Sequence, residues 1–301
     1  MEQAHDEDLM MRILVLGVTG MLGNAVFRLF NADPSHEVWG TLRSATALRY
    51  FPANERVLTG VDVLDQDVLI SLFERVHPDV VINCVGLIKQ FADANNPLIS
   101  LPINSLLPHR LANLCALVGA RLIHVSTDCV FSGRKGNYVE TDISDSEDMY
   151  GKSKYIGEIS DQPHVVTLRT SIIGHELASS RSLVDWFLSS KGEVRGFSRA
   201  IFSGLPTVEL ARVMKDHVLL RPELSGLYHV ASTPIAKLDL LRLVAAEYGK
   251  GTAILADDRL VIDRSLNCDR FRAATGYTAP GWPTLVALMH QDRQLMRVED
   301  V

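Results

Sequence analysis

The stretch Met11-Arg-Ile-Leu-Val-Leu-Gly17-Val-Thr-Gly20-Met-Leu-Gly23 decides the fold class of this chain. It predicts a short apolar strand, a tight glycine turn and the start of a helix. Glycine permits backbone dihedrals and close approaches that a Cβ atom would block. The spacing G-x-x-G-x-x-G is a variant of the fingerprint in which N–H groups at a helix N-terminus face a pyrophosphate; an ordinary strand-to-helix turn is the alternative. The cofactor-binding residues predicted here are Gly17, Thr19, Gly20, Met21, Leu22 and Gly23.

Downstream of this turn, short apolar runs alternate with helical patterns. Runs of strand length lie at 13–16, 38–39, 80–82, 122–125 and 165–168, and helical patterns lie at about 20–31, 65–76, 98–118 and 150–160. Continuous Val, Ile and Leu runs are typical of strands covered on both faces. Strands separated by helices join through right-handed crossovers. The pattern therefore predicts an α/β fold with a doubly wound parallel Rossmann sheet.

The alternation loosens after about residue 172. Helical patterns continue near 181–190, 208–219, 236–249 and 284–296, with turns at 203–206 and 278–281. We expect a flexible acidic tail at 1–9, a dinucleotide-binding domain at 10–172 and a smaller C-terminal substrate-binding domain at 173–301. The sequence leaves open whether segments of the second part interleave with the first.

Composition and charge exclude several classes of protein. The chain has 301 residues, 47% hydrophobic and 22% charged, which is typical of a globular protein. With 30 basic and 36 acidic residues its net charge is −6, which argues against a general nucleic-acid binder. No apolar run approaches the roughly 20 residues of a membrane span. The four cysteines show no C-x-x-C spacing. We expect a cytoplasmic protein with no nucleic-acid or membrane partner and no metal site.

Arg43 lies twenty residues after Gly23, where the fingerprint expects an acid that binds the ribose 2′-hydroxyl of NAD. A guanidinium at this place can pair with a 2′-phosphate, so the sequence favours NADPH, with NADH possible. A solvated surface arginine is the alternative. Asp62 and Val63 are expected beside the adenine. A turn of small residues after the fourth strand is expected to pass close to the cofactor, and its members are Cys84, Val85 and Gly86.

Tyr150 and Lys154 are one helical turn apart, so their side chains share a helix face. Reduction of a carbonyl needs a proton donor for the oxygen, and a nearby ammonium is expected to lower the pKa of the phenol. Lys154 can also hold the nicotinamide ribose. Ser126 and Thr127 end the fifth strand, where hydroxyls can bind a substrate carbonyl; capping of the strand end is the alternative reading of either.

These motifs, in this order, resemble the extended short-chain dehydrogenase/reductase superfamily, and within it the dTDP-4-dehydrorhamnose reductase family. The resemblance covers almost all of residues 11–295. Its most specific parts are Ser126-Thr-Asp-Cys-Val-Phe131-Ser-Gly133, Tyr150-Gly-Lys-Ser-Lys-Tyr-Ile-Gly157-Glu158 and Arg264-Ser-Leu-Asn267. The resemblance implies NAD(P)H-dependent reduction of a 4-keto-6-deoxy sugar on a nucleoside diphosphate. By motif, Thr127, Tyr150 and Lys154 would be catalytic and Asn104 would lie near the active site and cofactor.

The expected substrate contacts come from both parts of the chain. Cys129 stands where relatives often carry Tyr or Glu beside the sugar. Arg264 lies in the part expected to cover the sugar nucleotide, and a guanidinium suits a diphosphate. His175, beyond the sixth strand, is the best placed of the 10 histidines for substrate contact. The substrate-binding set is Ser126, Asp128, Cys129, His175 and Arg264.

Three alternatives remain open at this point. The substrate could be a UDP-linked N-acetylated 4-keto sugar. The chain could be a nucleotide-sugar epimerase or dehydratase that retains NAD, although Arg43 argues against this. It could also be a non-catalytic NADP-binding subunit, like the regulatory subunit of methionine adenosyltransferase, which resembles this family; the presence of Tyr150 and Lys154 argues against that alternative. A homodimer formed through helices 98–118 and 150–160 is possible.

Overall fold

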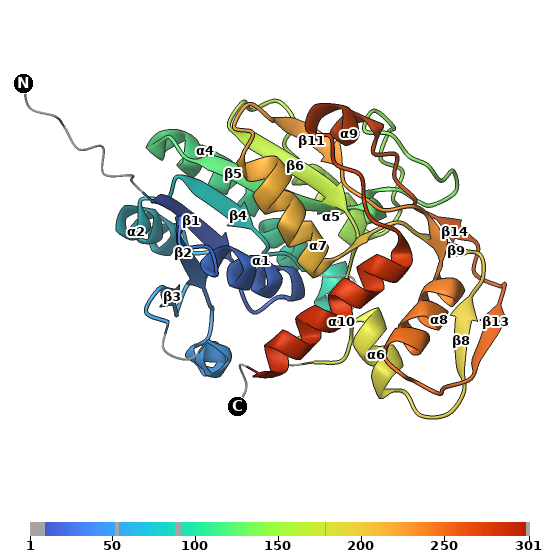
Figure 1. Ribbon diagram of the computed structural model, residues 1–301. Coiled ribbons are helices and arrows are strands. Elements are labelled where there is room, and N and C mark those ends of the chain that lie inside the picture. Colours follow the sequence, from blue (N-terminus) through green and yellow to red (C-terminus); the bar gives the residue numbers. More distant parts are fainter. Residues whose placement is uncertain (1–9, 52–53, 88–91, 178, 299–301) are drawn as a thin grey trace, which may run out of the picture.

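A seven-stranded parallel sheet forms the centre of the molecule, as the computed structural model shows (Figure 1). The model describes residues 10–51, 54–87, 92–177 and 179–298. The predicted tail at 1–9 lies outside the described residues. The strand order is β11-β6-β5-β4-β1-β2-β3. The strands are β1 (Met11–Leu16), β2 (His36–Thr41), β3 (Val57–Leu58), β4 (Val80–Asn83), β5 (Arg121–Thr127), β6 (Val165–Thr170) and β11 (Gly226–His229).

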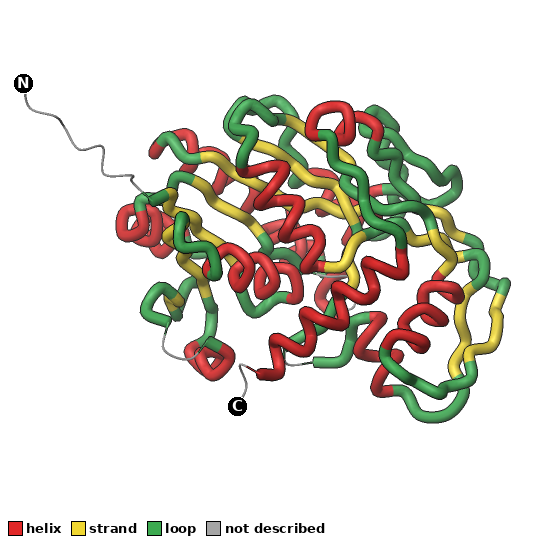
Figure 2. The backbone as a smooth tube through the Cα atoms, in the orientation of Figure 1, coloured by secondary structure: helices red, strands yellow, loops and turns green. Residues whose placement is uncertain are grey.

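Helices cover both faces of this sheet, which Figure 2 shows as red segments on either side of the yellow strands. The predicted doubly wound α/β fold is therefore confirmed. The helices on the two faces of the sheet are α1 (Met21–Asn31), α2 (Gln66–Val76), α4 (Leu107–Val118), α5 (Met149–Ile156) and α7 (Thr207–Val213), and α10 (Trp282–Val298) packs against α7 and α8. Among the described residues, no helix is both long and apolar enough to cross a membrane.

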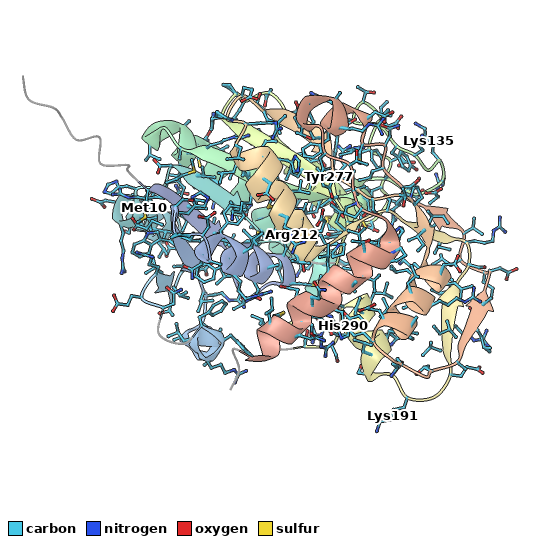
Figure 3. The ribbon with its side chains drawn as sticks, in the orientation of Figure 1. Met10, Lys135, Lys191, Arg212, Tyr277 and His290 are labelled. Atoms are coloured by element: carbon cyan, nitrogen blue, oxygen red, sulfur yellow. The ribbon has the colours of Figure 1, made fainter. Side chains whose placement is uncertain are left out.

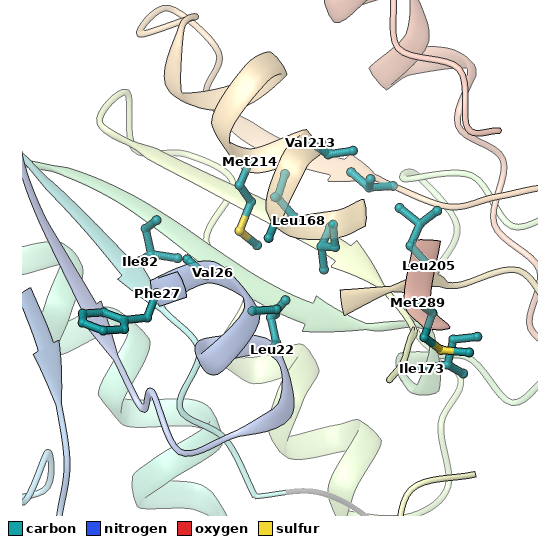
Figure 4. Close-up of a cluster of buried hydrophobic side chains, with 14 of the residues drawn as sticks. Leu22, Val26, Phe27, Ile82, Leu168, Ile173, Leu205, Val213, Met214 and Met289 are labelled. Atoms are coloured by element: carbon teal, nitrogen blue, oxygen red, sulfur yellow. The ribbon is translucent and has the colours of Figure 1, made fainter. Parts of the chain in front are cut away.

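The alternation of side chains along β1 builds two separate cores. Ile13 and Val15 pack into a core with α1, α7 and α10, part of which appears in Figure 4. Leu14 and Leu16 point to the opposite face and pack with α2 and α4. All four side chains are fully buried, and each such burial stabilises the fold by about 1.5–3 kcal/mol. Burial on both faces explains why the strands are continuous apolar runs.

The part of the chain after residue 172 is divided between the central sheet and a smaller lobe. β11 pairs with β6 in parallel register, and α7 packs on α1. The remaining segments form small sheets and helices beside the main body (Figure 1). These are β7 (Ile172–Ile173), α6 (Leu183–Ser189), β8 (Val194–Phe197), β9 (Ala200–Phe202), β10 (Leu205–Pro206), β12 (Ile235–Ala236), α8 (Lys237–Glu247), β13 (Ile254–Asp257) and β14 (Ile262–Asp263). The helix α9 (Asp269–Thr275) instead packs against β11 of the central sheet.

The helical pattern predicted at 98–118 is interrupted in the structure. A short α3 (Pro97–Ser100) continues into a π-helical segment, η3 (Leu101–Leu106), before α4 begins. A Cβ atom on Gly157 would lie 2.0 Å from the Asn104 carbonyl oxygen, so the glycine lets the end of α5 rest on η3. Wide turns of this kind occur often at functional sites.

Candidate active site

The glycine turn after β1 has the geometry that a bound pyrophosphate requires. Gly17 has φ +82°, and a Cβ atom there would lie 2.9 Å from Val85 Cγ2. A Cβ atom on Gly23 would lie 2.2 Å from the Gly17 carbonyl oxygen, so only glycine lets α1 approach the turn this closely. No side chain caps the N-terminus of α1 at Gly20. The first N–H groups of α1 are therefore left for a phosphate, and the residues present fit a dinucleotide.

The other residues predicted around the turn differ in exposure. Thr19 is exposed and Met21 is half-buried, whereas the Leu22 side chain packs in the core below. Leu22 can therefore offer a cofactor only its backbone. A Cβ atom on Gly174 would lie 3.3 Å from Met21 Cγ. The segment after β7 therefore packs directly against the glycine turn.

Arg43 and Asp62 lie on loops that follow β2 and β3. Both side chains are exposed. The Asp62 carboxylate accepts a hydrogen bond from the Leu64 N–H at 3.0 Å, and Val63 packs against the core. Thr41, at the end of β2, accepts a hydrogen bond from the Gly17 N–H at 3.2 Å. Because parallel strands end at the same edge of the sheet, Arg43 and Asp62 follow strands that end beside the glycine turn.

The turn after β4 is tied to η3 and to α5. The Asn104 side chain accepts a hydrogen bond from the Leu87 N–H at 2.9 Å and donates to Ser153 Oγ at 3.1 Å. A Cβ atom on Gly86 would lie 3.9 Å from Lys154 Nζ, so this turn runs beside the lysine. Burial raises the pKa of the Cys84 thiol to about 12, and Cys84 therefore stays protonated.

Tyr150 is half-buried and Lys154 is buried, and both lie near the carboxyl end of β5. Asp148 caps α5 by accepting a hydrogen bond from the Gly151 N–H at 2.8 Å. Thr127 lies beside the Tyr150 hydroxyl and acts to lower the pKa of the phenol. Lys154 Nζ donates to the Val125 carbonyl at 2.7 Å, and burial lowers the pKa of Lys154 to about 8.

The prediction that Lys154 lowers the pKa of Tyr150 is wrong for this structure. Burial raises the pKa of Tyr150, and the acidic neighbours Cys129, Asp128 and Asp148 raise it further; only the hydrogen bond with Thr127 acts in the other direction. The physical reason is that Lys154 extends to the Val125 carbonyl. The helical spacing places the two residues on one face but does not set where the ammonium points.

Asp128, Cys129 and Arg264 form a second group beside Thr127. Thr127 Oγ1 donates to Asp128 Oδ1 at 3.2 Å and accepts from the Cys129 N–H at 3.1 Å. Arg264 donates from Nε to the Phe131 carbonyl at 2.7 Å and from Nη1 to Cys129 Sγ at 3.6 Å. Burial raises the pKa of Asp128, and the Arg264 charge opposes this. The structure thus brings a cation of the C-terminal part next to the end of β5.

Ser126 points into a buried ionic network that the sequence did not reveal. Its hydroxyl donates to Glu158 Oε1 at 2.6 Å. Glu158 pairs with Arg169 at 2.5 Å, and both side chains are buried. Arg169 in turn contacts His229 Nε2 at 2.9 Å, and burial lowers the pKa of His229 to about 3. An arginine inside the apolar run 165–170 was the one available signal, because a buried guanidinium requires a carboxylate partner.

His175 is held by other side chains. Its Nδ1 lies 2.6 Å from Asp185 Oδ1 and 2.8 Å from Arg293 Nη1, and its Nε2 lies 2.8 Å from the Tyr248 hydroxyl. Tyr248 also stacks on His290 of α10 at 4.1 Å between ring centroids; Figure 3 labels His290. Both ring nitrogens of His175 are therefore engaged by partners outside the predicted site.

The doubly wound sheet, the glycine turn and the grouping of Tyr150, Lys154 and Thr127 define a Rossmann-fold protein of the short-chain dehydrogenase/reductase type. The family model described as the RmlD substrate binding domain matches residues 11–256. The chain belongs to that family.

Curated relatives carry several different names. The chain is 32% identical over 147 residues to methionine adenosyltransferase 2 subunit beta of Bos taurus, a match that covers 49% of this chain and 41% of that protein. The chain thus spans less than half of that relative's length. It is 27% identical over 284 residues to the probable low-salt glycan biosynthesis reductase Agl14 of Haloferax volcanii, covering 88% of this chain and 87% of that protein. It is 39% identical over 108 residues to dTDP-4-dehydrorhamnose reductase of Mycobacterium tuberculosis, covering 33% and 36%.

Solved structures share the fold over nearly the whole chain. The dTDP-4-dehydrorhamnose reductase of Bacillus anthracis in complex with NADP superimposes with a TM-score of 0.78 at 18% identity, covering 94% of this chain and 98% of that one. The Bordetella bronchiseptica enzyme WbmG in complex with NAD gives a TM-score of 0.77 at 18% identity, covering 95% of both chains. At these identities the likeness establishes the fold.

Proposed function

We propose that this protein is an NADPH-dependent reductase of a 4-keto-6-deoxy sugar carried on a nucleoside diphosphate. The observation that carries the proposal is the half-buried Tyr150 phenol beside Thr127 at the carboxyl end of β5, with Lys154 buried one helical turn away. Ligands of open parallel sheets bind at this edge. The family and the names of its reductase members support the same reaction class.

The cofactor would lie across the glycine turn. Its pyrophosphate would meet the first N–H groups of α1, and Arg43 would pair with the 2′-phosphate of NADP. Asn104 and Gly86 would border the nicotinamide end, because Gly86 lies next to Lys154 and Asn104 lies next to Gly86. The reduced nicotinamide supplies the hydride for the ketone carbon. The NADP complex of the Bacillus anthracis protein supports this cofactor, and the NAD complexes of other structures keep NADH as the competing cofactor.

Side chains of the protein would then supply the proton to the carbonyl oxygen. The raised pKa of Tyr150 keeps the phenol protonated at neutral pH, which is the form that donates to a carbonyl oxygen. Thr127 would polarise the same oxygen. Lys154, with a pKa of about 8, is mostly charged at pH 7 and would hold the ribose hydroxyls.

The substrate would lie between β5 and the C-terminal lobe. Arg264 would bind the diphosphate, and Asp128 and Cys129 would border the sugar. Ser126 and His175 are not included in the proposed site, because their polar atoms are engaged by Glu158 and by Asp185, Tyr248 and Arg293 respectively. A thiol at Cys129 is compatible with either a dTDP-linked or a UDP-linked sugar.

The test is NADPH oxidation against a panel of dTDP- and UDP-linked 4-keto sugars. Tyr150→Phe should lower kcat by roughly 100-fold or more, since positioned proton donors contribute factors of about 10² to 10⁴, and should leave NADPH affinity unchanged. Tyr155→Phe is the matched control, because Tyr155 lies on the same helix and is exposed. Normal turnover by Tyr150→Phe would show that another group is the acid.

A second candidate is a non-catalytic NADP-binding subunit. The 32% identity to methionine adenosyltransferase 2 subunit beta is the observation that favours it. NADPH binding without oxidation by any sugar of the panel would favour this candidate over the reductase.

A further inference from the structure

A cavity of about 440 Å³ lies in the C-terminal lobe, and none of its lining residues belongs to the candidate active site. Its walls come from the end of α6, the turn after α8 and the second half of α10, which lie beside one another in Figure 1. Small-molecule sites in proteins commonly have volumes of about 300–1,000 Å³. The side chains that line this cavity are Leu188, Tyr248, Lys250, His290, Arg293 and Gln294.

The polar part of the lining consists mainly of hydrogen-bond donors and cations. Lys250 and Arg293 carry positive charges, and Gln294 carries an amide donor. The described walls contain no carboxylate. Two carboxylates lie behind the lining: Asp185 pairs with Arg293 at 3.1 Å, and Glu247 lies 3.0 Å from His290 Nδ1. The surface that a ligand would meet therefore favours an anion.

The Lys250 ammonium is held in place from behind. Its Nζ donates to the carbonyls of Leu188 and Ser190, at the end of α6, at 2.7 and 2.8 Å. An ammonium has three N–H groups, so one remains for a ligand. Because the side chain is already ordered, a ligand that binds it causes little further loss of rotamer freedom.

The Arg293 guanidinium is held in the same way. Its Nη1 lies 2.8 Å from His175 Nδ1 and donates to Asp185 Oδ1 at 3.1 Å. Within the part of the chain that the structure describes, neither Nε nor Nη2 has a hydrogen-bond partner. Arginine binds phosphate oxygens through two parallel N–H groups, and Nε and Nη2 form such a pair.

The remaining walls of the cavity are apolar or aromatic. Leu188 contributes an aliphatic side chain, and Tyr248 contributes a ring that stacks on His290 at 4.1 Å between centroids. A single phosphate ion would occupy only part of the volume. The cavity therefore has room for a carbon skeleton beside the phosphate.

We propose that this cavity binds a small phosphorylated molecule. Its phosphate meets Lys250, Arg293 and Gln294, and its carbon skeleton packs against Tyr248 and Leu188. The site is separate from the proposed reductase site and does not depend on that function.

A charge placed in the cavity wall is the first test. Gln294→Glu puts a carboxylate beside the two cations, and Gln291→Glu is the matched control, because both glutamines are exposed on α10 and only Gln294 lines the cavity. In calorimetric titrations with inorganic phosphate, we expect the dissociation constant of Gln294→Glu to be on the order of 10-fold higher than that of Gln291→Glu. Phosphate bound at the glycine turn would affect both variants alike. Equal dissociation constants would overturn the proposal.

Removing a cation is the second test. Lys250→Gln should raise the dissociation constant for inorganic phosphate by a similar factor, whereas Lys191→Gln, at an exposed lysine labelled in Figure 3, should leave it unchanged. Thermal unfolding of both variants checks the fold. Equal phosphate binding by two folded variants would contradict the role of Lys250. If Lys250→Gln does not fold, the comparison of Gln294→Glu with Gln291→Glu decides.

The ligand class and the location are tested on the wild-type chain. At least one of ethyl phosphate, glycerol 3-phosphate and glucose 6-phosphate should bind more tightly than inorganic phosphate, and weaker binding by all three would contradict a ligand with a carbon skeleton. A crystal soaked in inorganic phosphate should show density beside Lys250 and Arg293. Density at the glycine turn alone would overturn the site. A chain that oxidises no NADPH would refute the proposed function and leave these results unchanged.

Discussion

Replacing Gly23 by alanine tests the glycine turn most directly. The added Cβ atom would lie 2.2 Å from the Gly17 carbonyl oxygen and 2.8 Å from its carbonyl carbon, and contacts below 3.0 Å are essentially never observed. The backbone must therefore move by about 0.8 Å, the difference between 3.0 and 2.2 Å. Both partners belong to backbone, so no side-chain rotation relieves the clash. α1 has to move away from β1.

Two opposing effects set the change in the free energy of unfolding of Gly23→Ala. Alanine is favoured over glycine inside a helix by about 1 kcal/mol, while overpacking costs about 3 kcal/mol or more when backbone must shift. The net loss of about 2 kcal/mol should lower Tm by roughly 4 °C. Losing one hydrogen bond to a charged phosphate, about 1.5–3 kcal/mol, should weaken NADPH binding about 10- to 100-fold.

The assays are thermal unfolding and titration of NADPH fluorescence. Gly251→Ala is the matched control, because nothing lies within 4 Å of its added Cβ atom. If Gly23→Ala has the same Tm and NADPH affinity as Gly251→Ala, the assignment of this turn to the pyrophosphate is refuted.

Four further predictions concern other parts of the molecule. Arg43→Ala should weaken NADPH binding and leave NADH binding unchanged; equal losses for both cofactors in fluorescence titrations would contradict the 2′-phosphate role. Glu158→Gln should lower the unfolding free energy in urea by about 3–5 kcal/mol, because it leaves the buried charge of Arg169 unpaired. The pKa of His229 is about 3 in the fold against about 6.5 unfolded, so the unfolded state takes up the proton first. Stability should then fall by about 2 kcal/mol between pH 7 and pH 5, and His229→Gln should remove that part of the loss. Ile156 is 53% exposed on α5, and if that face joins two copies of this chain, Ile156→Asp should lower the mass measured by light scattering.

The sequence predicted the central fold because its signals are local. The run 13–16 and the glycines after it form a strand and a turn through contacts within one βα unit. The helix pattern at 65–76 matches α2 because its apolar spacing reflects one buried face. Strands β8 and β13 were not predicted, since each is stabilised by pairing with residues 60 positions away in the sequence. The hydrophobic pattern within either segment does not reveal that the two strands pair.

The sequence predicted which residues form the candidate site better than it predicted the contacts that they make. The spacing of Tyr150 and Lys154 places both on α5, but the carbonyl that binds Lys154 belongs to β5 and depends on tertiary packing. His175 follows a strand end, which suggested a place at the site. Its engagement by Asp185 and Tyr248 arises from α6 and the end of α8, which no pattern near residue 175 indicates.

The return of β11 to the edge of β6 has a consequence for cutting the chain. A fragment that stopped at residue 172 would leave the backbone groups of β6 unpaired along an open flank, where they would recruit other polypeptides. It would also lack α7 and α10, whose side chains cover the apolar core beside α1. Neither half can therefore be moved to another protein as a ready-made module.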